Sequence, residues 1–346
     1  MDRWKNKKLR AIIKNERLFL ERVRGEILLE ELIECCDGKS NPIKFFSADQ
    51  IVNATENFCK SSLVSGLFGY ERWYSGTLNH RTILVKKLWR AQPPHPRDFY
   101  PEARDIAISS MVSGHKNFMK LVGCCLEIDI PFLVYYGAEK HYSSIDLNIV
   151  VSWEKRLKIA EDVATALAYL HSAFQRPFLN DFSRCVSIPE GETFVKLSSR
   201  FAKGAYVYFD DNYLINHVVS EKTDAFGFGI FIQKLITGEE NFRELYGGIL
   251  QRDRLERKVP KWLPKSVGEG RFEDVVDPKM GEISEEERSR MEAFIFLSER
   301  CMGDRGEVPK MVEVAKELKG FLRNATSSTE SPKSILSNHL FPKNRP

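Results

Sequence analysis

Apolar residues recur at roughly helical spacing along the first 36 residues of the chain. The stripe consists of Leu9, Ile12, Ile13, Leu20, Val23, Ile27, Leu28 and Leu32. Because one face of a helix repeats every three to four residues, this pattern predicts a single long helix over residues 1–36. Residues 37–42 are rich in turn-forming types and end that helix. We therefore expect residues 1–45 to form an N-terminal helical extension.

The pattern of apolar and polar positions differs between the two halves of the remaining chain. Strand-like and short helical patterns fill residues 46–137, whereas residues 153–172 carry the clearest amphipathic helix. Further helices are predicted at the C-terminal ranges 222–237, 285–302 and 309–321. This distribution predicts an α+β protein with a small β-rich N-lobe at 46–137 and a helical C-lobe at 138–324. The polar stretch 325–346 is predicted to be a disordered tail.

Charge changes this picture mainly at the N-terminus. The whole chain has 52 Lys and Arg against 48 Asp and Glu, and this near balance argues against a nucleic-acid binder. The first 24 residues, however, hold nine basic residues and three acidic ones. Two interpretations remain open for this basic amphipathic segment. It faces an acidic partner or an anionic membrane surface, or it is a solvated helix whose apolar side packs on the next domain.

The sequence carries no obvious address to a membrane or an oxidising compartment. The longest apolar run, around Phe226–Ile232, is too short to span a bilayer, and the charged start does not resemble a signal peptide. Residue 2 is Asp2, so N-myristoylation is not expected. Seven cysteines occur without any Cys-x-x-Cys spacing, which disfavours a zinc site or a disulfide framework. We expect a cytoplasmic protein with reduced, buried thiols and no metal site.

Six blocks of the sequence resemble, in order, segments of a plant receptor-like protein kinase. Ile83-Leu84-Val85-Lys86 resembles the Val-Ala-Ile-Lys strand of the small lobe, and Leu133-Val134-Tyr135 resembles the entry to the hinge. The other blocks are residues 46–58, 115–127, 168–171 and 221–229. The resemblance implies a two-lobe protein-kinase-like fold over roughly residues 46–322.

The small-lobe parts of a kinase active site are only partly present. Phosphoryl transfer needs the phosphates, the metal ion and the acceptor hydroxyl to be held in place. In the phosphate-covering loop only Gly66 keeps the register, and Leu84 replaces the alanine that roofs the adenine. Lys86 aligns with the phosphate-binding lysine, although a surface lysine on a strand is the plainer alternative. Asp105 is the best match to its glutamate partner and is shorter by one methylene, about 1.5 Å.

The large-lobe parts of the active site are missing in either possible register. Without a gap, the catalytic aspartate is Phe182 and the metal-binding asparagine is Ser187. A shift of one residue makes Asp181 the base but places Val186, which cannot bind magnesium, five residues later. Ser199 stands where the magnesium-binding aspartate is expected, and a neutral hydroxyl cannot replace that carboxylate. Losing a positioned general base alone costs a factor of about 10² to 10⁴ in rate.

A buried ion pair of active kinases is also absent from both sides. The glutamate that ends the activation segment corresponds to Asn212, and its arginine partner corresponds to Val308. Removing only one partner would leave a buried charge at a cost of roughly 3–5 kcal/mol, so the joint loss is physically coherent. The sequence therefore predicts a pseudokinase with vestigial nucleotide-binding positions Gly66, Lys86 and Asp105. We expect no cofactor and disfavour binding of ATP and Mg²⁺.

The N-terminal part and the small lobe also resemble the plant ZED-related kinase family. The similarity lies in residues 19–21, 27–33, 36–43, 109–118 and 121–127. It implies a cytoplasmic immune adaptor that binds the leucine-rich-repeat region of a ZAR-type coiled-coil nucleotide-binding (NLR) receptor. Such an adaptor acts as a decoy for bacterial effectors or recruits an effector-modified receptor-like cytoplasmic kinase, and its partners could bring it to the plasma membrane.

The surface that would bind such a receptor is open at this level. The candidates are the apolar positions Ile27, Leu28, Leu29, Leu32 and Ile33, or the nearby small-lobe surface. The competing interpretation is that these side chains pack on the small lobe itself. Two other functions also remain. One is a weak or atypical serine/threonine kinase using Lys86, Asp105 and Asp181, and the other is a non-catalytic regulator of an active receptor-like kinase.

Overall fold

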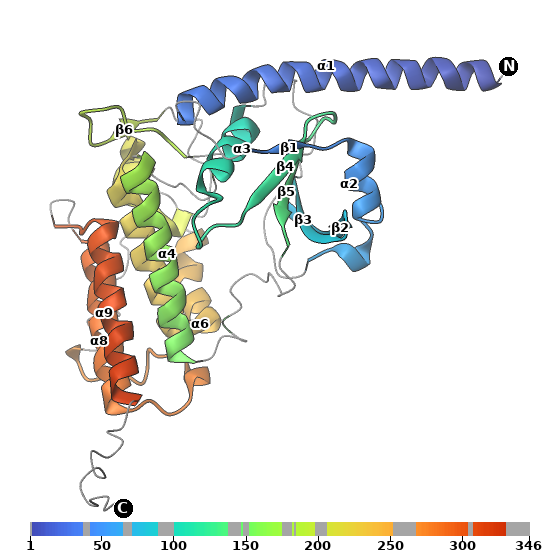
Figure 1. Cartoon of the computed structure of the whole chain (residues 1–346). Coiled ribbons are helices and arrows are strands. Elements are labelled where there is room, and N and C mark those ends of the chain that lie inside the picture. Colours follow the sequence, from blue (N-terminus) through green and yellow to red (C-terminus); the bar gives the residue numbers. More distant parts are fainter. Residues whose placement is uncertain are drawn as a thin grey trace, which may run out of the picture.

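The structure is a computed structural model of the 346-residue chain. It describes residues 2–36, 42–64, 71–88, 100–137, 147, 152–174, 182, 185–197, 206–251, 268–303 and 307–329. A small lobe built around a β-sheet is followed by a helical large lobe, and a long N-terminal helix lies across the outside of the small lobe (Figure 1). This arrangement confirms the α+β, two-lobe architecture predicted from the sequence pattern.

The sheet of the small lobe has the strand order β1-β4-β5-β3-β2. Its strands are β1 (Lys44–Phe45), β2 (Glu71–Leu78), β3 (Arg81–Leu88), β4 (Leu121–Cys125) and β5 (Phe132–Tyr136). All neighbours are antiparallel except β1, which runs parallel to β4 with Lys44 opposite Gly123. Strands β2 and β3 form a hairpin whose two turn residues, Asn79 and His80, have φ angles of 50° and 61°. Positive φ at both positions suits the right-handed twist of a two-residue hairpin.

Helices cover both faces of this sheet. Helix α3 (Tyr100–Val112) and helix α1 pack on one face, in a cluster that includes Leu84 and Leu133. Helix α2 (Ala48–Ala54) packs on the other face, where Val85 is fully buried. Successive residues of a strand point to opposite faces, so Leu84 and Val85 belong to different clusters.

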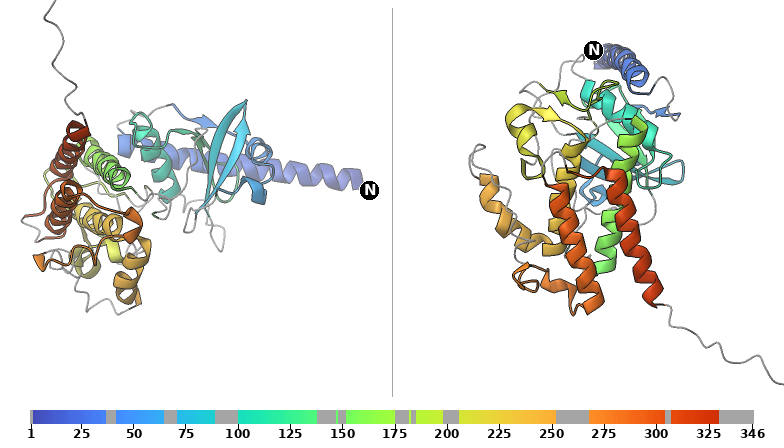
Figure 2. Two further views of the ribbon diagram at one scale, coloured as in Figure 1. Left: turned by 90° about the horizontal axis from the view of Figure 1, so that it is seen from below. Right: turned by 90° about the vertical axis from the view of Figure 1, so that its left-hand side faces the viewer.

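Helix α1 (Asp2–Cys36) is a single 35-residue helix, as predicted. Its C-terminal half packs on α3, whereas its N-terminal half extends past the edge of the small lobe (Figures 1 and 2). Leu20 is the first of its described side chains to be buried. The apolar stripe therefore has two environments, one inside the protein and one in solvent.

The large lobe is built on four long helices. They are α4 (Trp153–Phe174), α6 (Glu221–Gln251), α8 (Glu285–Cys301) and α9 (Met311–Thr329), and α4 packs on α9 while α6 packs on α8. Shorter elements complete the described part: helix α5 (Asp211–Asn216), strands β6 (Val195–Lys196) and β7 (Val218–Val219), and the 3₁₀ turns η1 (Lys60–Ser62), η4 (Tyr206–Tyr208) and η5 (Pro278–Met280).

The ends of two helices compare differently with the prediction. In α6 the helical conformation stops before Gly238, as the predicted range 222–237 has it, because Gly238 has non-helical angles (φ 77°, ψ 173°), and a second helical stretch follows it within the same element. Helix α9 continues to Thr329, so residues 325–329 are helical and not part of a disordered tail. Phe321 and Leu322 still pack on the core, and no proline or glycine lies between them and Thr329 to stop the helix earlier. The rest of the predicted tail lies outside the described residues.

Buried polar pairs join the helices of the large lobe. Arg156 Nη2 lies 2.5 Å from Asp277 Oδ2, and Arg156 Nη1 donates to the carbonyl oxygen of Leu235 at 2.8 Å. His171 Nε2 lies 2.7 Å from Asp224 Oδ2, which links α4 to α6. Removing one partner of such a pair would leave a buried charge or dipole uncompensated.

The described cysteines are free thiols. Burial raises the pKa of Cys125 to about 11 and that of Cys301 to about 12. These side chains therefore stay protonated and behave as small apolar groups. Cys59 differs, because it is partly exposed and hydrogen bonds from Ser61 and Ser62 lower its pKa.

Candidate functional site

Lys86 and Asp105 form a buried ion pair between strand β3 and helix α3. Lys86 Nζ lies 2.8 Å from Asp105 Oδ2, and the two residues are only 5% and 2% exposed. The other carboxylate oxygen of Asp105 accepts a hydrogen bond from Ser109 Oγ at 3.2 Å, and Ser109 shares another with the Tyr135 hydroxyl at 3.1 Å. The structure thus brings together two of the three residues assigned to a vestigial nucleotide site and links them to internal partners.

The ring of Trp73 lies close to this pair. Trp73 stands opposite Lys86 in the β2–β3 hairpin, with its ring centroid 5.9 Å from Lys86 Nζ and 5.3 Å from the ring centroid of Tyr135. Leu84, two residues before Lys86 on the same face of β3, is 4% exposed in the same cluster. Two bulky side chains, Trp73 and Leu84, therefore pack close to Lys86. The sequence motif indicated only Leu84. The signal that could have revealed Trp73 is the hairpin register.

The described part of the catalytic loop contains no acid or base at the position of the catalytic aspartate. Phe182 packs beside Leu170 and Cys185, and its ring centroid lies 5.9 Å from that of Phe118. Ser187 is exposed. A phenyl ring cannot accept a proton, so Phe182 serves packing. The other predicted positions, Gly66, Asp181 and Ser199, lie outside the described residues.

The two positions of the lost kinase ion pair face the same hollow. Asn212 and Val308 both line a cavity of about 230 Å³, together with Asp210, Lys222 and residues of α8. Asp210 caps helix α5 by accepting a hydrogen bond from the Tyr213 backbone at 2.7 Å. The segment after the activation loop is therefore still fixed locally, although neither partner of the ion pair is present at these positions.

Helix α1 is held on the small lobe by buried charges. The guanidinium of Arg24 donates to the backbone carbonyl oxygens of Leu126, at 3.0 Å, of Ile128, and of Asp129, at 2.6 Å. Arg24 is 1% exposed, and burial lowers its pKa. These bonds satisfy carbonyl groups after strand β4 that would otherwise be buried without donors.

A second anchor joins α1 to α3 directly. Glu31 accepts two hydrogen bonds from the guanidinium of Arg104, both at 3.1 Å, and its side chain is 2% exposed. One residue earlier, Glu30 accepts a bond from the Tyr100 hydroxyl at 3.3 Å. The fork-shaped pairing of arginine with a carboxylate fixes both position and orientation. Sequence periodicity could not reveal these contacts, because it follows apolar residues only.

The five apolar interface candidates of α1 divide into two groups. Ile27 and Leu28 are 6% and 1% exposed in the small-lobe core, and Leu32 packs partly against the same core. Ile27 and Leu28 are therefore covered by their own lobe, and Leu32 is covered only in part. Leu29 and Ile33, one helical turn apart, are each 58% exposed. Packing on the small lobe therefore accounts for Ile27 and Leu28, whereas Leu29 and Ile33 remain accessible and stay interface candidates.

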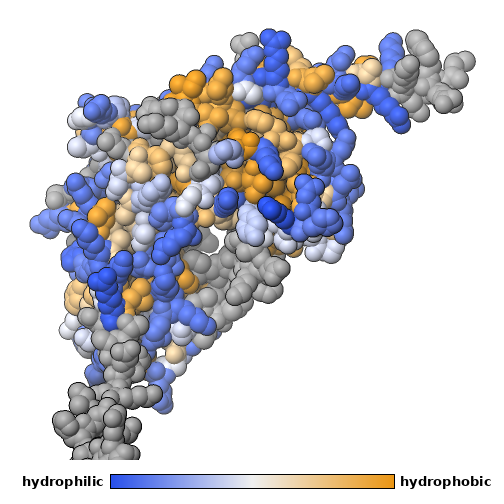
Figure 3. Space-filling view, viewed as in Figure 1, coloured by the Kyte–Doolittle hydropathy of each residue, from blue (hydrophilic) through white to orange (hydrophobic). Residues whose placement is uncertain are grey.

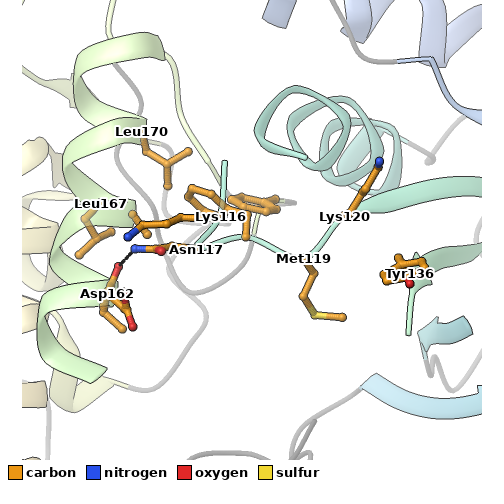
Figure 4. A pocket seen from close by; sticks show the side chains of 12 residues that line it. Lys116, Asn117, Met119, Lys120, Tyr136, Asp162, Leu167 and Leu170 are labelled. Carbon is orange, nitrogen blue, oxygen red and sulfur yellow. Dashed lines mark hydrogen bonds between the residues drawn. The ribbon is translucent and has the colours of Figure 1, made fainter. Parts of the chain in front are cut away.

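A further hollow lies where α4 meets the segment between α3 and β4. It has a volume of about 620 Å³, within the usual range of ligand pockets. Leu167 and Leu170 point into it from α4, and the Asn117 side chain crosses to α4, where it donates to the Asp162 carbonyl oxygen at 2.8 Å (Figure 4). Phe182 also lines it, and the pattern of the sequence did not predict this hollow.

Comparison with curated proteins identifies the family. No protein-family model matches the chain. The chain is 55% identical to the non-functional pseudokinase ZRK15 of Arabidopsis thaliana, over 95% of this chain and 98% of that protein. The chain belongs to the ZED-related kinase (ZRK) family. It is also 50% identical to a probable inactive receptor-like protein kinase of the same plant, over 89% of this chain and 90% of that protein.

A third ZRK relative agrees with this assignment. The inactive serine/threonine-protein kinase ZRK12 of Arabidopsis thaliana is 49% identical, over 89% of this chain and 80% of that protein. The chain is accordingly a kinase-like pseudokinase, as its sequence predicted. No helix in the described ranges is long and apolar enough to cross a membrane. Within the same ranges, no group of three His, Cys, Asp or Glu side chains is placed to hold a metal ion.

Proposed function

We propose that this ZRK-family pseudokinase is a non-catalytic adaptor in plant innate immunity. It binds the leucine-rich-repeat region of a ZAR-type coiled-coil NLR receptor. It connects that receptor to bacterial effectors, as a decoy, or to effector-modified receptor-like cytoplasmic kinases. The observation that carries the proposal is the exposed Leu29–Ile33 pair on a helix that is otherwise firmly anchored.

Anchoring makes this pair suitable for binding. Arg24 and Glu31 bond the same stretch of α1 to the small lobe, so Leu29 and Ile33 are presented by a rigid helix. A preorganised surface loses less conformational entropy on association than a loop does. Beside the pair, Arg22 and Glu26 form an exposed ion pair at 3.3 Å. An apolar centre with a polar rim is the usual anatomy of a protein interface.

The small lobe also exposes apolar side chains. Hydrophobic side chains gather over the small lobe beside the C-terminal half of α1 (Figure 3). Phe45, in the short edge strand β1, is 56% exposed. A leucine-rich-repeat array offers an extended concave surface, which can receive a projecting helix edge. We place this adaptor in the cytoplasm and assign its recruitment to the plasma membrane to its partners.

The decisive experiment is a binding measurement with the leucine-rich-repeat region of a ZAR-type receptor. We expect the full chain to form a one-to-one complex in size-exclusion chromatography. The double substitution Leu29→Glu and Ile33→Glu should weaken it at least about 100-fold in biolayer interferometry, because two charges would enter an apolar contact. Phe296→Glu with Val312→Glu is the matched control, since both residues are exposed but lie on the large lobe.

Each outcome has a distinct meaning. Unchanged binding of the α1 variant would assign the receptor to another surface. If the unmodified chain forms no complex at micromolar concentration, the adaptor proposal fails. The alternative function, a non-catalytic regulator of an active receptor-like kinase, would then be tested by affinity capture from plant extract, in which a co-purifying kinase would support it.

A further inference from the structure

The first half of α1 forms a projecting arm, which we call the overhang and define as residues 2–16. Among the described side chains of α1, Arg17 is the first to bond to the small lobe, through Asp49 at 3.2 Å, and Leu20 is the first to be buried. The 15 residues before Arg17 span about 22 Å at the rise of an α-helix. The overhang lies at one edge of the molecule in every view (Figures 1 and 2).

The overhang is amphipathic. Leu9, Ile12 and Ile13 are 56%, 54% and 41% exposed, and at 100° per residue they lie within an arc of about 100°. Arg10 and Lys14, one turn apart, flank this arc, and at 100° per residue Arg10 lies about 60° from Ile13. These two cations form no ion pair with any described residue. The acidic Glu16 interrupts the apolar arc only at the end nearest the domain.

The exposed apolar side chains of the overhang, Leu9, Ile12 and Ile13, lie together on one side of the helix, and such a patch marks an interaction surface. Charge narrows the choice of partner. Residues 2–16 hold six basic and two acidic residues, 6 − 2 = +4, and the whole chain has 52 − 48 = +4. The net positive charge of the protein therefore resides in the overhang. A second copy of the same arm would bring like charges together, and this disfavours self-association.

We propose that the overhang binds the surface of an anionic lipid bilayer. A helix with an apolar arc and a cationic flank lies in the plane of a membrane surface, where it buries the first and pairs the second with lipid headgroups. An acidic protein segment is a less suitable partner, because carboxylates that entered the hollow beside Arg10 and Lys14 would meet carboxylates of the protein itself. The hollow of about 470 Å³ beside the cationic flank is lined by Arg10 and Lys14 but also by Glu21, Asp49 and Glu127.

That mixed lining also sets the kind of recognition. A compact anion seated in the hollow would meet three carboxylates as well as the cations. Attraction by total surface charge, without preference for one headgroup, is therefore the expected mode. This direct contact with lipid goes beyond recruitment through a receptor and does not depend on it.

Flotation of the purified full chain with lipid vesicles tests the proposal. We expect binding to phosphatidylcholine vesicles that contain about one-third phosphatidylserine, weakening with added salt, and no binding to phosphatidylcholine alone. Arg10→Gln with Lys14→Gln should lower the partition coefficient about 30-fold. Leu9→Asn with Ile12→Asn should lower it at least about tenfold.

The controls separate a local effect from a general one. Lys316→Gln with Lys319→Gln removes the same charge from the exposed side of α9, and Phe296→Asn removes an exposed apolar group from α8; both should bind like the unmodified chain. All substituted residues are exposed, so thermal unfolding should be unchanged and each variant stays informative.

Three results would overturn the proposal. The first is no flotation with anionic vesicles at low salt. The second is flotation that neither overhang variant reduces. The third is absence of vesicle binding together with overhang-dependent binding to an acidic helix-binding protein, such as calcium-loaded calmodulin, or overhang-dependent dimerisation.

Discussion

At the scale of single residues, the former phosphate lysine is held by internal partners. Lys86 pairs with Asp105, Asp105 accepts from Ser109, and Trp73 and Leu84 crowd the same cleft. In a working kinase this lysine must reach a nucleotide. Here the 5% exposure of Lys86 indicates that its main role is to stabilise the small lobe.

This role predicts a large effect of Lys86→Met on stability. The substitution leaves Asp105 buried without its counter-ion, and such losses cost about 3–5 kcal/mol. Urea unfolding followed by circular dichroism would measure it. The double variant Lys86→Met with Asp105→Leu should recover most of the loss, because no buried charge then remains. A loss below about 1 kcal/mol in the single variant would contradict a structural role.

Residue-level prediction from sequence was possible where a linear motif fixes the position. The Val-Ala-Ile-Lys-like block singled out Lys86 and the following helix singled out Asp105, and the structure places these two side chains in contact. Trp73 and Arg24 were missed for a different reason. Their partners, across a hairpin for Trp73 and more than 100 residues away for Arg24, depend on tertiary contacts that local patterns do not encode.

At the scale of elements, the edge strand β1 is very short and its backbone lies unusually close to that of β4. Strand β1 lies parallel to β4, and Phe46 N donates to the Cys124 carbonyl oxygen at 2.9 Å. A Cβ atom on Gly123 would overlap the carbonyl oxygen of Lys44 and lie 2.8 Å from the Phe46 ring. Glycine is required at this position because two backbones meet there.

Gly123→Ala should therefore destabilise the small lobe by about 2 kcal/mol or more. The matched control is Gly114→Ala, since nothing lies within 4 Å of a Cβ at that position. Thermal unfolding of the two variants in parallel would measure the difference. Equal melting temperatures would show that β1 can move aside, and that the contact between β1 and β4 is not rigid.

Element-level prediction was accurate for helices and incomplete for their ends. The starts of α4 and α8 match the predicted ranges, and at α8 a capping box between Ser284 and Glu287 fixes the start. The first helical stretch of α6 ends before Gly238, in line with the predicted range 222–237, whereas the second stretch after Gly238 was not predicted. Helix α9 continues past its last apolar contact, since backbone bonds extend a helix without a buried face. Periodicity detects the buried face and not the full length of a helix.

At the scale of the whole molecule, a kinase architecture is kept while its catalytic parts are replaced. The large-lobe core, the Arg156–Asp277 and His171–Asp224 pairs and the cap of α5 maintain the fold. Phe182, one of the two residues predicted for the base position, packs in an apolar cluster. Family membership fits this pattern, because the relatives ZRK15 and ZRK12 are named non-functional or inactive.

We expect that ATP with Mg²⁺ does not stabilise this protein. A ligand that binds the folded state raises the melting temperature through mass action, so a shift near zero at millimolar ATP is the expected result. An active receptor-like kinase domain serves as the positive control. A clear shift, or metal-dependent phosphate transfer that Lys86→Met abolishes, would instead support the weak-kinase alternative.

The continuity of α1 fixes the distance between its two exposed apolar surfaces. No break separates its docked half from its projecting half, so Leu9 and Leu29 are held about 30 Å apart along one rigid rod. A receptor bound at Leu29 and a lipid surface bound at Leu9 would therefore keep a fixed spacing. Tilting the docked half by about 10° would swing the free tip through about 4 Å, so small movements at the small lobe are magnified at its end.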